Sequence, residues 1–221
     1  MIIVMLGAPG TGKGTVGGLL SKQLGIVHIS SGEIFRSYVK KHRVLGKKIE
    51  NYILKGQLVP DELAIELIEK RLQEDDTIAG MILDGYPRNI NQAVQLNQLL
   101  GKQGKKVDVA VNLDLPDNEI IDRIIKRRTC PNTECREIYN LDFKPPIKNG
   151  ICDKCNFPLI QRSDDNEETV KQRLETYHKV SENLIEFYKS QDILYTLKLN
   201  SKSDVTTMNI AEEVKNYIDN H

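Results

Sequence analysis

Hydrophobic and polar positions follow two alternating patterns along the chain. Short apolar, β-branched runs predict strands at residues 2–6, 27–29, 81–83, 109–113 and 193–199. Longer stretches with apolar residues at helical spacing predict helices at 12–24, 61–74, 89–103, 117–127, 167–189 and 205–218. Because such alternation is typical of βαβ units, the sequence predicts a doubly wound α/β fold with a five-stranded parallel sheet and helices on both faces.

Two segments interrupt this alternation. Residues 30–60 carry a helical pattern without a strand, and Ser30 with Glu33 fits a capping box at the start of a helix. Residues 128–165 are rich in Cys, Pro, Asn and Gly, a composition too irregular for a helix. We therefore expect a core of residues 1–29, 61–127 and 166–221, with a helical insertion at 30–60 and a cysteine-stapled hairpin module at 128–165.

Composition and charge narrow the class of protein. Of the 221 residues, 39% are hydrophobic, which together with the glycines is typical of a folded globular chain. The 31 Lys and Arg balance 31 Asp and Glu, so the chain lacks the overall positive field of a general nucleic-acid binder. The opening apolar run, residues 2–6, is too short for a signal peptide or a membrane span. We expect a cytoplasmic protein that binds neither nucleic acid nor membrane.

The first predicted strand leads directly into G-A-P-G-T-G-K-G-T, residues 7–15, and then into a helix. In this context G-x-x-x-x-G-K indicates a phosphate-binding loop, because its backbone N–H groups converge on phosphate oxygens and its lysine adds a positive charge. The alternative is a plain glycine-rich turn. Gly14 stands where such loops usually have Ser or Thr, so the sequence favours a Mg²⁺ ion held largely through water.

Further motifs follow in order along the chain. They are S-S-G-E at 30–33, D-G-Y-P-R at 84–88, D-R-I-I-K-R-R at 122–128 and Q-R-S-D-D at 161–165. With the G-K-G-T ending of the loop, they make the chain similar to the adenylate kinase family of nucleoside monophosphate kinases over nearly its whole length. The resemblance implies a monomer that transfers a phosphoryl group from MgATP to AMP, giving two ADP, with residues 128–165 as a lid over ATP and residues 30–60 closing over AMP.

The resemblance also implies a set of functional residues. The implied catalytic side chains are Lys13, Arg88, Arg123, Arg127, Arg162 and Arg173. The implied ATP contacts are Gly10, Thr11, Gly12, Lys13, Gly14, Thr15, Arg123, Arg127, Ile138, Tyr139 and Ser203. The implied AMP contacts are Ser31, Arg36, Gln57, Leu58, Val59, Gly85, Tyr86, Pro87, Arg88, Gln92, Arg162 and Arg173. Asp84 is implied to orient water on Mg²⁺.

The D-G-Y-P-R motif and the glutamine after it also carry signals of their own. Asp84 to Arg88 follow the third predicted strand, at the carboxyl edge where open α/β folds bind ligands; the alternative is an Asp-Gly turn with a surface arginine. Gln92 lies four residues past Arg88, on the same helical face. The resemblance implies that its amide reads adenine, whereas a glutamine on a helix is otherwise usually solvated.

The arginines have a plainer alternative. Arg123 and Arg127 are spaced i,i+4, which places two like charges on one helical face at a cost of a few tenths of a kcal/mol that an anion would reverse. The alternative is a solvated basic face. We expect Arg162 to precede the helix that Asp164 or Asp165 caps, so its convergence with Arg173 is implied by the resemblance alone.

Three implied contacts have competing structural roles or depart from the family. Ser31 stands where the family usually has Thr, and it competes with Ser30 as a helix cap. Tyr139 fits a hairpin packing residue as well as a cover for the ATP base. The segment at 200–203 lacks the glycine of the family's adenine-contacting loop, which weakens the assignment of Ser203.

All four cysteines lie within 26 residues, as Cys130-x4-Cys135 and Cys152-x2-Cys155. Two close pairs on two turns of a hairpin favour one tetrahedral Zn²⁺, and a closed shell of four thiolates makes such a zinc structural. Disulfides, free thiols or another soft metal are the alternatives. The four histidines show no ligand spacing and are treated as ordinary.

Two other functions compete with adenylate kinase. The first is a kinase for UMP, CMP or GMP, which differs in how the acceptor base is read. The second is a nucleotide-gated zinc-ribbon module that binds nucleic acid without transferring phosphate. Zero net charge and the few aromatics around the cysteines weigh against the second.

Overall fold

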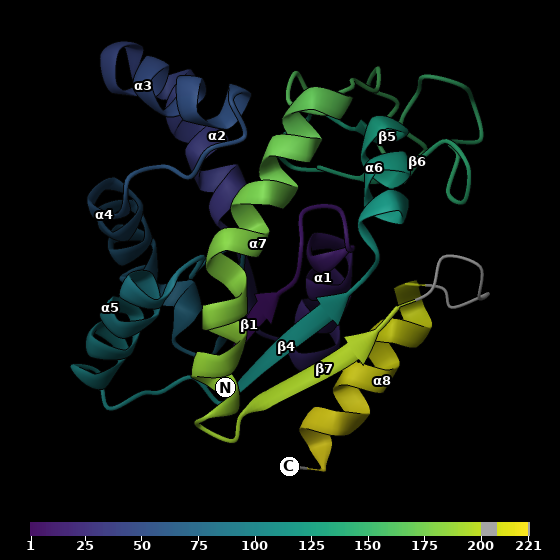
Figure 1. Cartoon of the computed structure of the whole chain (residues 1–221). Coiled ribbons are helices and arrows are strands. Elements are labelled where there is room, and N and C mark those ends of the chain that lie inside the picture. The colour runs from purple at the N-terminus through teal and green to yellow at the C-terminus, as the bar shows by residue number, and fades with distance from the viewer. Residues whose placement is uncertain (200–206, 221) are drawn as a thin grey trace.

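A five-stranded parallel sheet forms the centre of the molecule. The computed structural model describes residues 1–199 and 207–220, and its strands lie in the order β2-β3-β1-β4-β7 (Figure 1). The strands are β1 Ile2–Leu6, β2 Val27–Ser30, β3 Met81–Asp84, β4 Val109–Asp114 and β7 Leu194–Lys198. Each neighbouring pair is parallel. The predicted α/β fold is confirmed.

The central strand β1 is buried on both of its faces. Its five residues are at most 6% exposed, as expected of a parallel strand covered by helices on both sides. Ile2, Val4 and Leu6 belong to one hydrophobic core, whereas Ile3 and Met5 belong to the other. This alternation places the end of β1, where the phosphate-binding loop begins, between two packed layers.

Helices cover both faces of the sheet (Figure 1). The helices α4 Asp61–Leu72, α5 Ile90–Gly101 and α7 Glu167–Lys189 pack on one face, and α1 Lys13–Leu24 and α8 Thr207–Asp219 pack on the other. A short 3₁₀ helix, Asp75–Thr77, precedes β3, and α6 Asp117–Ile125 packs against α7. Within the described ranges, no helix has both the length and the apolar character needed to cross a membrane.

The segment 30–60 is helical, as its pattern predicts. It contains α2 Ser31–Lys41 and α3 Arg43–Leu54, which pack around Phe35 and Ile49. The predicted capping box is wrong, because the Ser30 side chain makes no capping hydrogen bond to any described residue and Glu33 instead accepts a hydrogen bond from Arg136 at 2.5 Å. Glu33 therefore faces the segment 128–165 rather than its own helix end.

A short antiparallel hairpin opens the segment 128–165: β5 Arg127–Thr129, which begins one residue before it, is paired to β6 Ile138–Asn140. The helix predicted to reach residue 127 ends at Ile125, because Arg127 is already paired with Asn140 in the hairpin.

The prediction that Asp164 or Asp165 caps α7 is also wrong. Asn166 is the N-cap, and its Oδ1 accepts the Thr169 N–H at 2.9 Å.

Candidate active site

The phosphate-binding loop connects the end of β1 to the start of α1. Gly12 is the N-cap of α1 with φ 99°, a left-handed conformation that favours glycine. Since Gly12 has no side chain to cap the helix, the first N–H groups of α1 are open to a ligand, and a helix N-terminus suits an anion. The Thr11 hydroxyl donates to the Ala8 carbonyl at 3.0 Å and so holds the turn of the loop itself.

Lys13, the first residue of α1, extends along the loop. Its Nζ donates to the Gly7 and Ala8 carbonyls, each at 2.7 Å. The pKa of Lys13 is lowered to about 8: burial is the largest cause, the nearby guanidinium groups of Arg88 and Arg127 also lower it, and Asp84 partly opposes them. The ammonium thus lies where a negatively charged ligand would restore its usual basicity.

Asp84, at the end of β3, lies directly beside the loop. A Cβ added to Gly14 would come within 3.2 Å of the Asp84 Oδ2, a tight contact that a small shift of Asp84 would have to relieve. Burial raises the pKa of Asp84, but the His28 imidazole and the Lys13 ammonium outweigh it, so the pKa of the carboxyl lies below its usual value. The His28 Nε2 lies 3.6 Å from Oδ2, a neighbour that the spacing of the histidines did not indicate.

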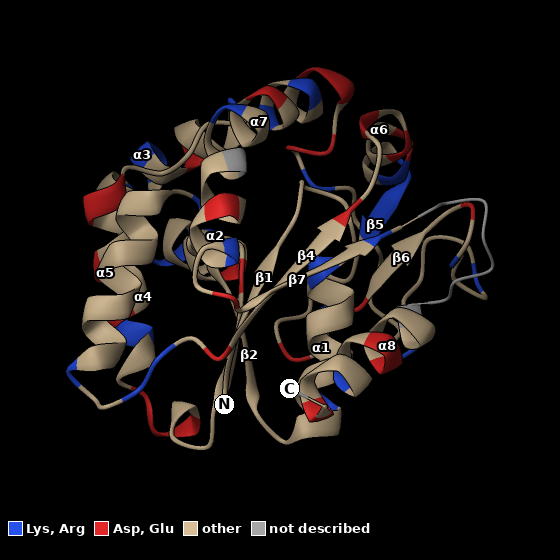
Figure 2. Ribbon diagram, turned by 60° about the horizontal axis from the view of Figure 1, so that its bottom comes forward, with Lys and Arg blue, Asp and Glu red and all other residues tan. Residues whose placement is uncertain are grey.

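Five half-buried arginines lie around this edge of the sheet, and each comes from a different segment. They are Arg36 on α2, Arg88 after β3, Arg127 on β5, Arg162 before α7 and Arg173 on α7. Burial lowers the pKa of Arg36, Arg88 and Arg162, and neighbouring guanidinium groups lower each further. Figure 2 shows β5 as a basic stretch beside the sheet. Such a concentration of like charge favours a multiply charged anion.

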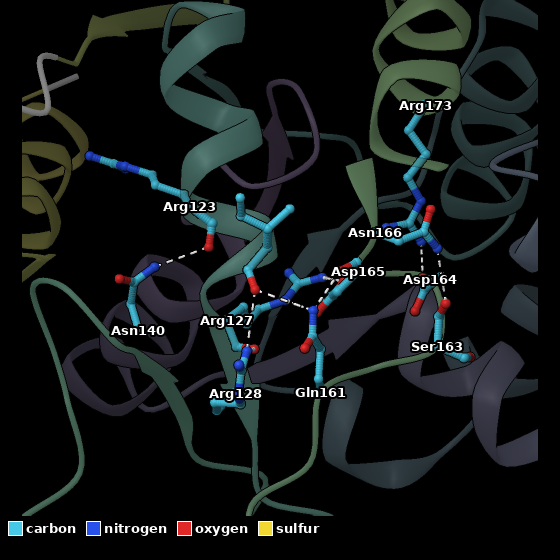
Figure 3. Close-up of polar contacts among 11 residues, drawn as sticks. Arg123, Arg127, Arg128, Asn140, Gln161, Ser163, Asp164, Asp165, Asn166 and Arg173 are labelled. Carbon is cyan, nitrogen blue, oxygen red and sulfur yellow. Dashed lines mark hydrogen bonds and ion pairs between the residues drawn. The ribbon is translucent and has the colours of Figure 1, made fainter. Parts of the chain in front are cut away.

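Two buried carboxylates hold members of this arginine cluster in place. Asp165, whose side chain is 0% exposed, accepts two hydrogen bonds from Arg127, at 2.5 and 2.8 Å. Asp164 forms an ion pair with Arg173 (Figure 3). Burial raises the pKa of Asp164, but the surrounding arginines lower it more strongly, which keeps the carboxylate ionised. The acidic pair therefore orients the guanidinium groups before any ligand arrives.

Arg123 lies apart from these arginines. Its side chain points away from Arg127 and Arg173 (Figure 3), and its guanidinium carbon lies 5.3 Å from the centre of the Phe143 ring. The prediction that Arg123 and Arg127 share a helical face is wrong, because α6 ends before Arg127. In this structure Arg123 therefore lies against Phe143 and outside the arginine cluster.

A pocket opens beside Arg88, between the helical insertion and the D-G-Y-P-R turn. Its lining combines predicted AMP contacts with two apolar residues that sequence reasoning missed, Phe35 and Ala64. The lining residues are Phe35, Leu58, Val59, Ala64, Gly85, Tyr86, Arg88 and Gln92. Ser31 lies at the edge of this turn, where its hydroxyl donates to the Gly85 carbonyl at 2.6 Å. Gln57 is exposed and is not among the lining residues, and Pro87 is buried within the turn.

Gln92 is buried, with only 2% of its surface exposed. Its side-chain oxygen accepts the Arg88 N–H at 2.8 Å, and its nitrogen donates to Asp61 Oδ1 at 2.7 Å. Gln92 is therefore held by the protein and is not a solvated surface glutamine. Asp61, at the start of α4, carried no sequence signal beyond its place as the first residue of a helix.

The four cysteines converge in a compact cluster. Their Sγ atoms all lie within 4.8 Å of one another, with Cys130 and Cys155 at 3.3 Å and Cys135 and Cys152 at 3.6 Å. Four thiolates around Zn²⁺ at ~2.3 Å require sulfur separations of ~3.8 Å, so the cluster fits a tetrahedral zinc ion. None of the four cysteines forms a disulfide bond in this structure.

Two further predicted ATP contacts lie on β6, next to the cysteine cluster. Tyr139 is 3% exposed and packs among the cysteines, and its hydroxyl accepts the Asp153 N–H at 2.8 Å. These contacts are those of a packing residue. Ile138 is half-buried on the same strand. The predicted contact Ser203 lies outside the described residues.

The fold and the site together define a phosphate-binding-loop α/β protein, with two insertions beside a cationic sheet edge. Residues 5–193 match the model of the adenylate kinase family. The chain is 47% identical to the adenylate kinase of Caldicellulosiruptor saccharolyticus over 196 residues, covering 89% of this chain and 90% of that protein. It is 41% identical to the adenylate kinase of Clostridium novyi over 219 residues, covering 99% of both.

The chain therefore belongs to the adenylate kinase family, whose members are nucleoside monophosphate kinases. This confirms the resemblance inferred from the motifs. A kinase for another monophosphate and a non-catalytic zinc-ribbon module are not favoured by these matches.

Proposed function

We propose that the protein catalyses MgATP + AMP ⇌ 2 ADP by direct in-line transfer between two bound nucleotides. The observation that carries the proposal is the convergence of Lys13 and five arginines from separate segments on the carboxyl edge of the sheet. Phosphoryl transfer requires positioning and charge neutralisation more than a protein nucleophile, and this cluster supplies both.

The positions of these cations support a division of roles. Lys13 and the N-terminus of α1 would bind the phosphates of ATP, with Arg127 beside them, and Arg123 would contact the same nucleotide from the side of Phe143. Arg88, at the pocket beside Gln92, would hold the phosphate of AMP, with Arg36 nearby. Arg162 and Arg173 would contact the phosphates between the two nucleotides. Asp84 would orient water on the Mg²⁺ that accompanies ATP.

We propose that residues 128–165 form a lid over ATP and that residues 30–60 close over AMP, both inserted into a core of 1–29, 61–127 and 166–221. Closure of the two insertions would exclude water from the site and so suppress the hydrolysis of ATP that competes with phosphoryl transfer. The ion pair of Arg136 with Glu33 at 2.5 Å supports this view, since it joins the two insertions to each other. The four cysteines would hold a structural zinc within the lid.

We further propose a monomer in the cytoplasm that needs no nucleic-acid or membrane partner. The monomer is what membership of the adenylate kinase family leads us to expect. Four clustered thiols suit zinc binding in a reducing compartment, where disulfides are rare.

Initial rates with AMP, GMP, CMP and UMP as acceptors test this function. With MgATP as donor, the proposal expects ADP formation to be fastest with AMP, and to be unchanged by added RNA or DNA. Comparable or higher kcat/KM with another monophosphate would assign a different acceptor. ATP consumption that depends on nucleic acid and not on AMP would instead support the zinc-ribbon module.

A further inference from the structure

Asp61 gathers three side-chain amides at the edge of the AMP pocket. Its carboxylate accepts hydrogen bonds from Asn89 at 2.9 Å, Asn91 at 2.9 Å and Gln92 at 2.7 Å. Burial raises the pKa of Asp61, but these three hydrogen bonds outweigh it and lower the pKa. The carboxylate is therefore ionised near neutral pH, and an ionised carboxylate can only accept hydrogen bonds.

The Gln92 amide is held at both of its ends. The Arg88 N–H can only donate and so requires the Gln92 oxygen, while the Asp61 carboxylate can only accept and so requires the Gln92 nitrogen. A reversed amide would direct its oxygen at a carboxylate and its NH₂ at an N–H group. These contacts therefore fix one orientation of the amide.

The fixed amide keeps one hydrogen-bonding group of each kind for a ligand. Of its two N–H bonds and two oxygen lone pairs, one N–H is bound to Asp61 and one lone pair to Arg88. One donor and one acceptor remain, in an order that the protein sets. Adenine presents an amino donor beside a ring-nitrogen acceptor, whereas hypoxanthine and guanine present a carbonyl acceptor beside a ring N–H donor.

We propose that Asp61 is a positioning residue for base selection, which fixes the Gln92 amide in the orientation that pairs with adenine and opposes a 6-oxopurine. The proposal rests on the proposed function, because it takes Gln92 as the residue facing the base of the acceptor nucleotide. A 6-oxopurine could form the same pair of hydrogen bonds with Gln92 only if the amide reversed. That reversal would break the hydrogen bonds of Gln92 with both Asp61 and the Arg88 N–H. The Arg88 contact uses a backbone N–H, which a side-chain substitution does not remove. The contact with the Asp61 carboxylate is therefore the one that mutation can test.

The test compares kcat/KM for AMP with kcat/KM for inosine monophosphate, which has the reversed hydrogen-bonding edge without the extra amino group of guanine. In the Asp61→Ala variant, the reversed Gln92 amide no longer places its oxygen against a carboxylate, and only the contact with the Arg88 N–H still opposes it. The AMP-to-IMP ratio, which is kcat/KM for AMP divided by kcat/KM for inosine monophosphate (IMP), should therefore fall at least ~10-fold. The KM for ATP should change less than ~3-fold, because Asp61 contacts only the acceptor side.

Two matched variants separate positioning from structural support. Asp61→Asn can keep an oxygen toward Gln92 and Asn89 while its NH₂ faces the exposed Asn91, so its ratio should stay within ~3-fold of the unsubstituted enzyme. Asn91→Ala removes the third donor without touching Gln92 and should leave the ratio unchanged. If Asp61→Ala folds poorly, Asp61→Ser, whose hydroxyl is too short to hold Gln92, replaces it in the same comparison.

The outcomes distinguish this inference from the proposed function. Loss of AMP activity in Gln92→Leu, together with an unchanged AMP-to-IMP ratio in Asp61→Ala or Asp61→Ser, would overturn the role of Asp61 alone. An AMP kcat/KM that is unaffected in Gln92→Leu would overturn the placement of the base itself. A ratio that falls as far in Asp61→Asn as in Asp61→Ala would also contradict the proposal, because the charge rather than the oxygen would then matter.

Discussion

The titration of Lys13 links the geometry of the loop to a measurable pH dependence. Burial and neighbouring arginines lower the pKa of Lys13 from its ordinary value of 10.5 to about 8. The ammonium form, which the phosphates require, therefore prevails below pH 8 and is lost as the pH rises through 8. One pH unit above the pKa, only ~10% of the free enzyme keeps the charge. We expect kcat/KM for ATP to fall ~10-fold between pH 7 and pH 9.

The assay is the initial rate of ADP formation at subsaturating ATP, because kcat/KM reports the pKa values of the free enzyme. Bound phosphates stabilise the ammonium, so the corresponding fall in kcat at saturating ATP should be displaced to higher pH. Lys13→Arg is the control, because its guanidinium remains protonated over this range. The variant should be less active but should lack the fall in kcat/KM through pH 8.

Either of two results would refute this reasoning about Lys13. A kcat/KM for ATP that stays level from pH 7 to pH 9 would show that the lysine keeps an ordinary pKa in the free enzyme. A fall of the same size at the same pH in Lys13→Arg would assign the titration to another group.

Three further predictions follow from the site. Lys13→Ala should lower kcat ~10²–10³-fold, since the ammonium stabilises charge that moves during transfer; a rise in KM alone would contradict this. Asp165→Ala leaves Arg127 without its buried partner and should reduce the free energy of unfolding in urea by ~3–5 kcal/mol, whereas Glu66→Gln, in an exposed pair, should cost at most ~1 kcal/mol. Removing metal, or changing Cys152 and Cys155 to Ser, should lower the Tm and expose residues 128–165 to protease while activity at low temperature largely remains; unchanged melting or a metal-free purified protein would reject a structural zinc.

Much of the fold could be predicted because its signals are local. The strand pattern of β1, the glycines and lysine of the loop, and the spacing of the cysteines each report on a short segment. The conformation of Arg127 was missed because strand pairing with residue 140, far along the chain, decides it. The cap of α7 was missed for a related reason, since Asp165 is engaged by Arg127 on β5 and Asp164 by Arg173 further along α7.

In the candidate site, too, local motifs could be recognised in the sequence, whereas contacts between distant segments could not. The motifs named candidate residues, but they did not indicate Phe35 or Ala64 in the lining of the pocket or which contacts the candidates make. Nothing in the sequence placed Phe143 beside Arg123, or Arg136 beside Glu33, because these pairs join segments that only the fold brings together. The role of Asp61 emerged only from its three hydrogen bonds, although its place at the start of a helix was evident. A long-range polar network of this kind has no periodic signal in a single sequence.

The central claim is that the cationic edge transfers a phosphoryl group directly between two nucleotides and excludes water. Phosphorus NMR of the protein with Mg²⁺, ATP and AMP tests it most directly, because ATP, ADP, AMP and inorganic phosphate are resolved in one spectrum. The account predicts two ADP formed for each ATP and AMP consumed, no accumulation of inorganic phosphate, and no loss of ATP when AMP is omitted. Release of inorganic phosphate in step with ATP loss, with or without AMP, would contradict it.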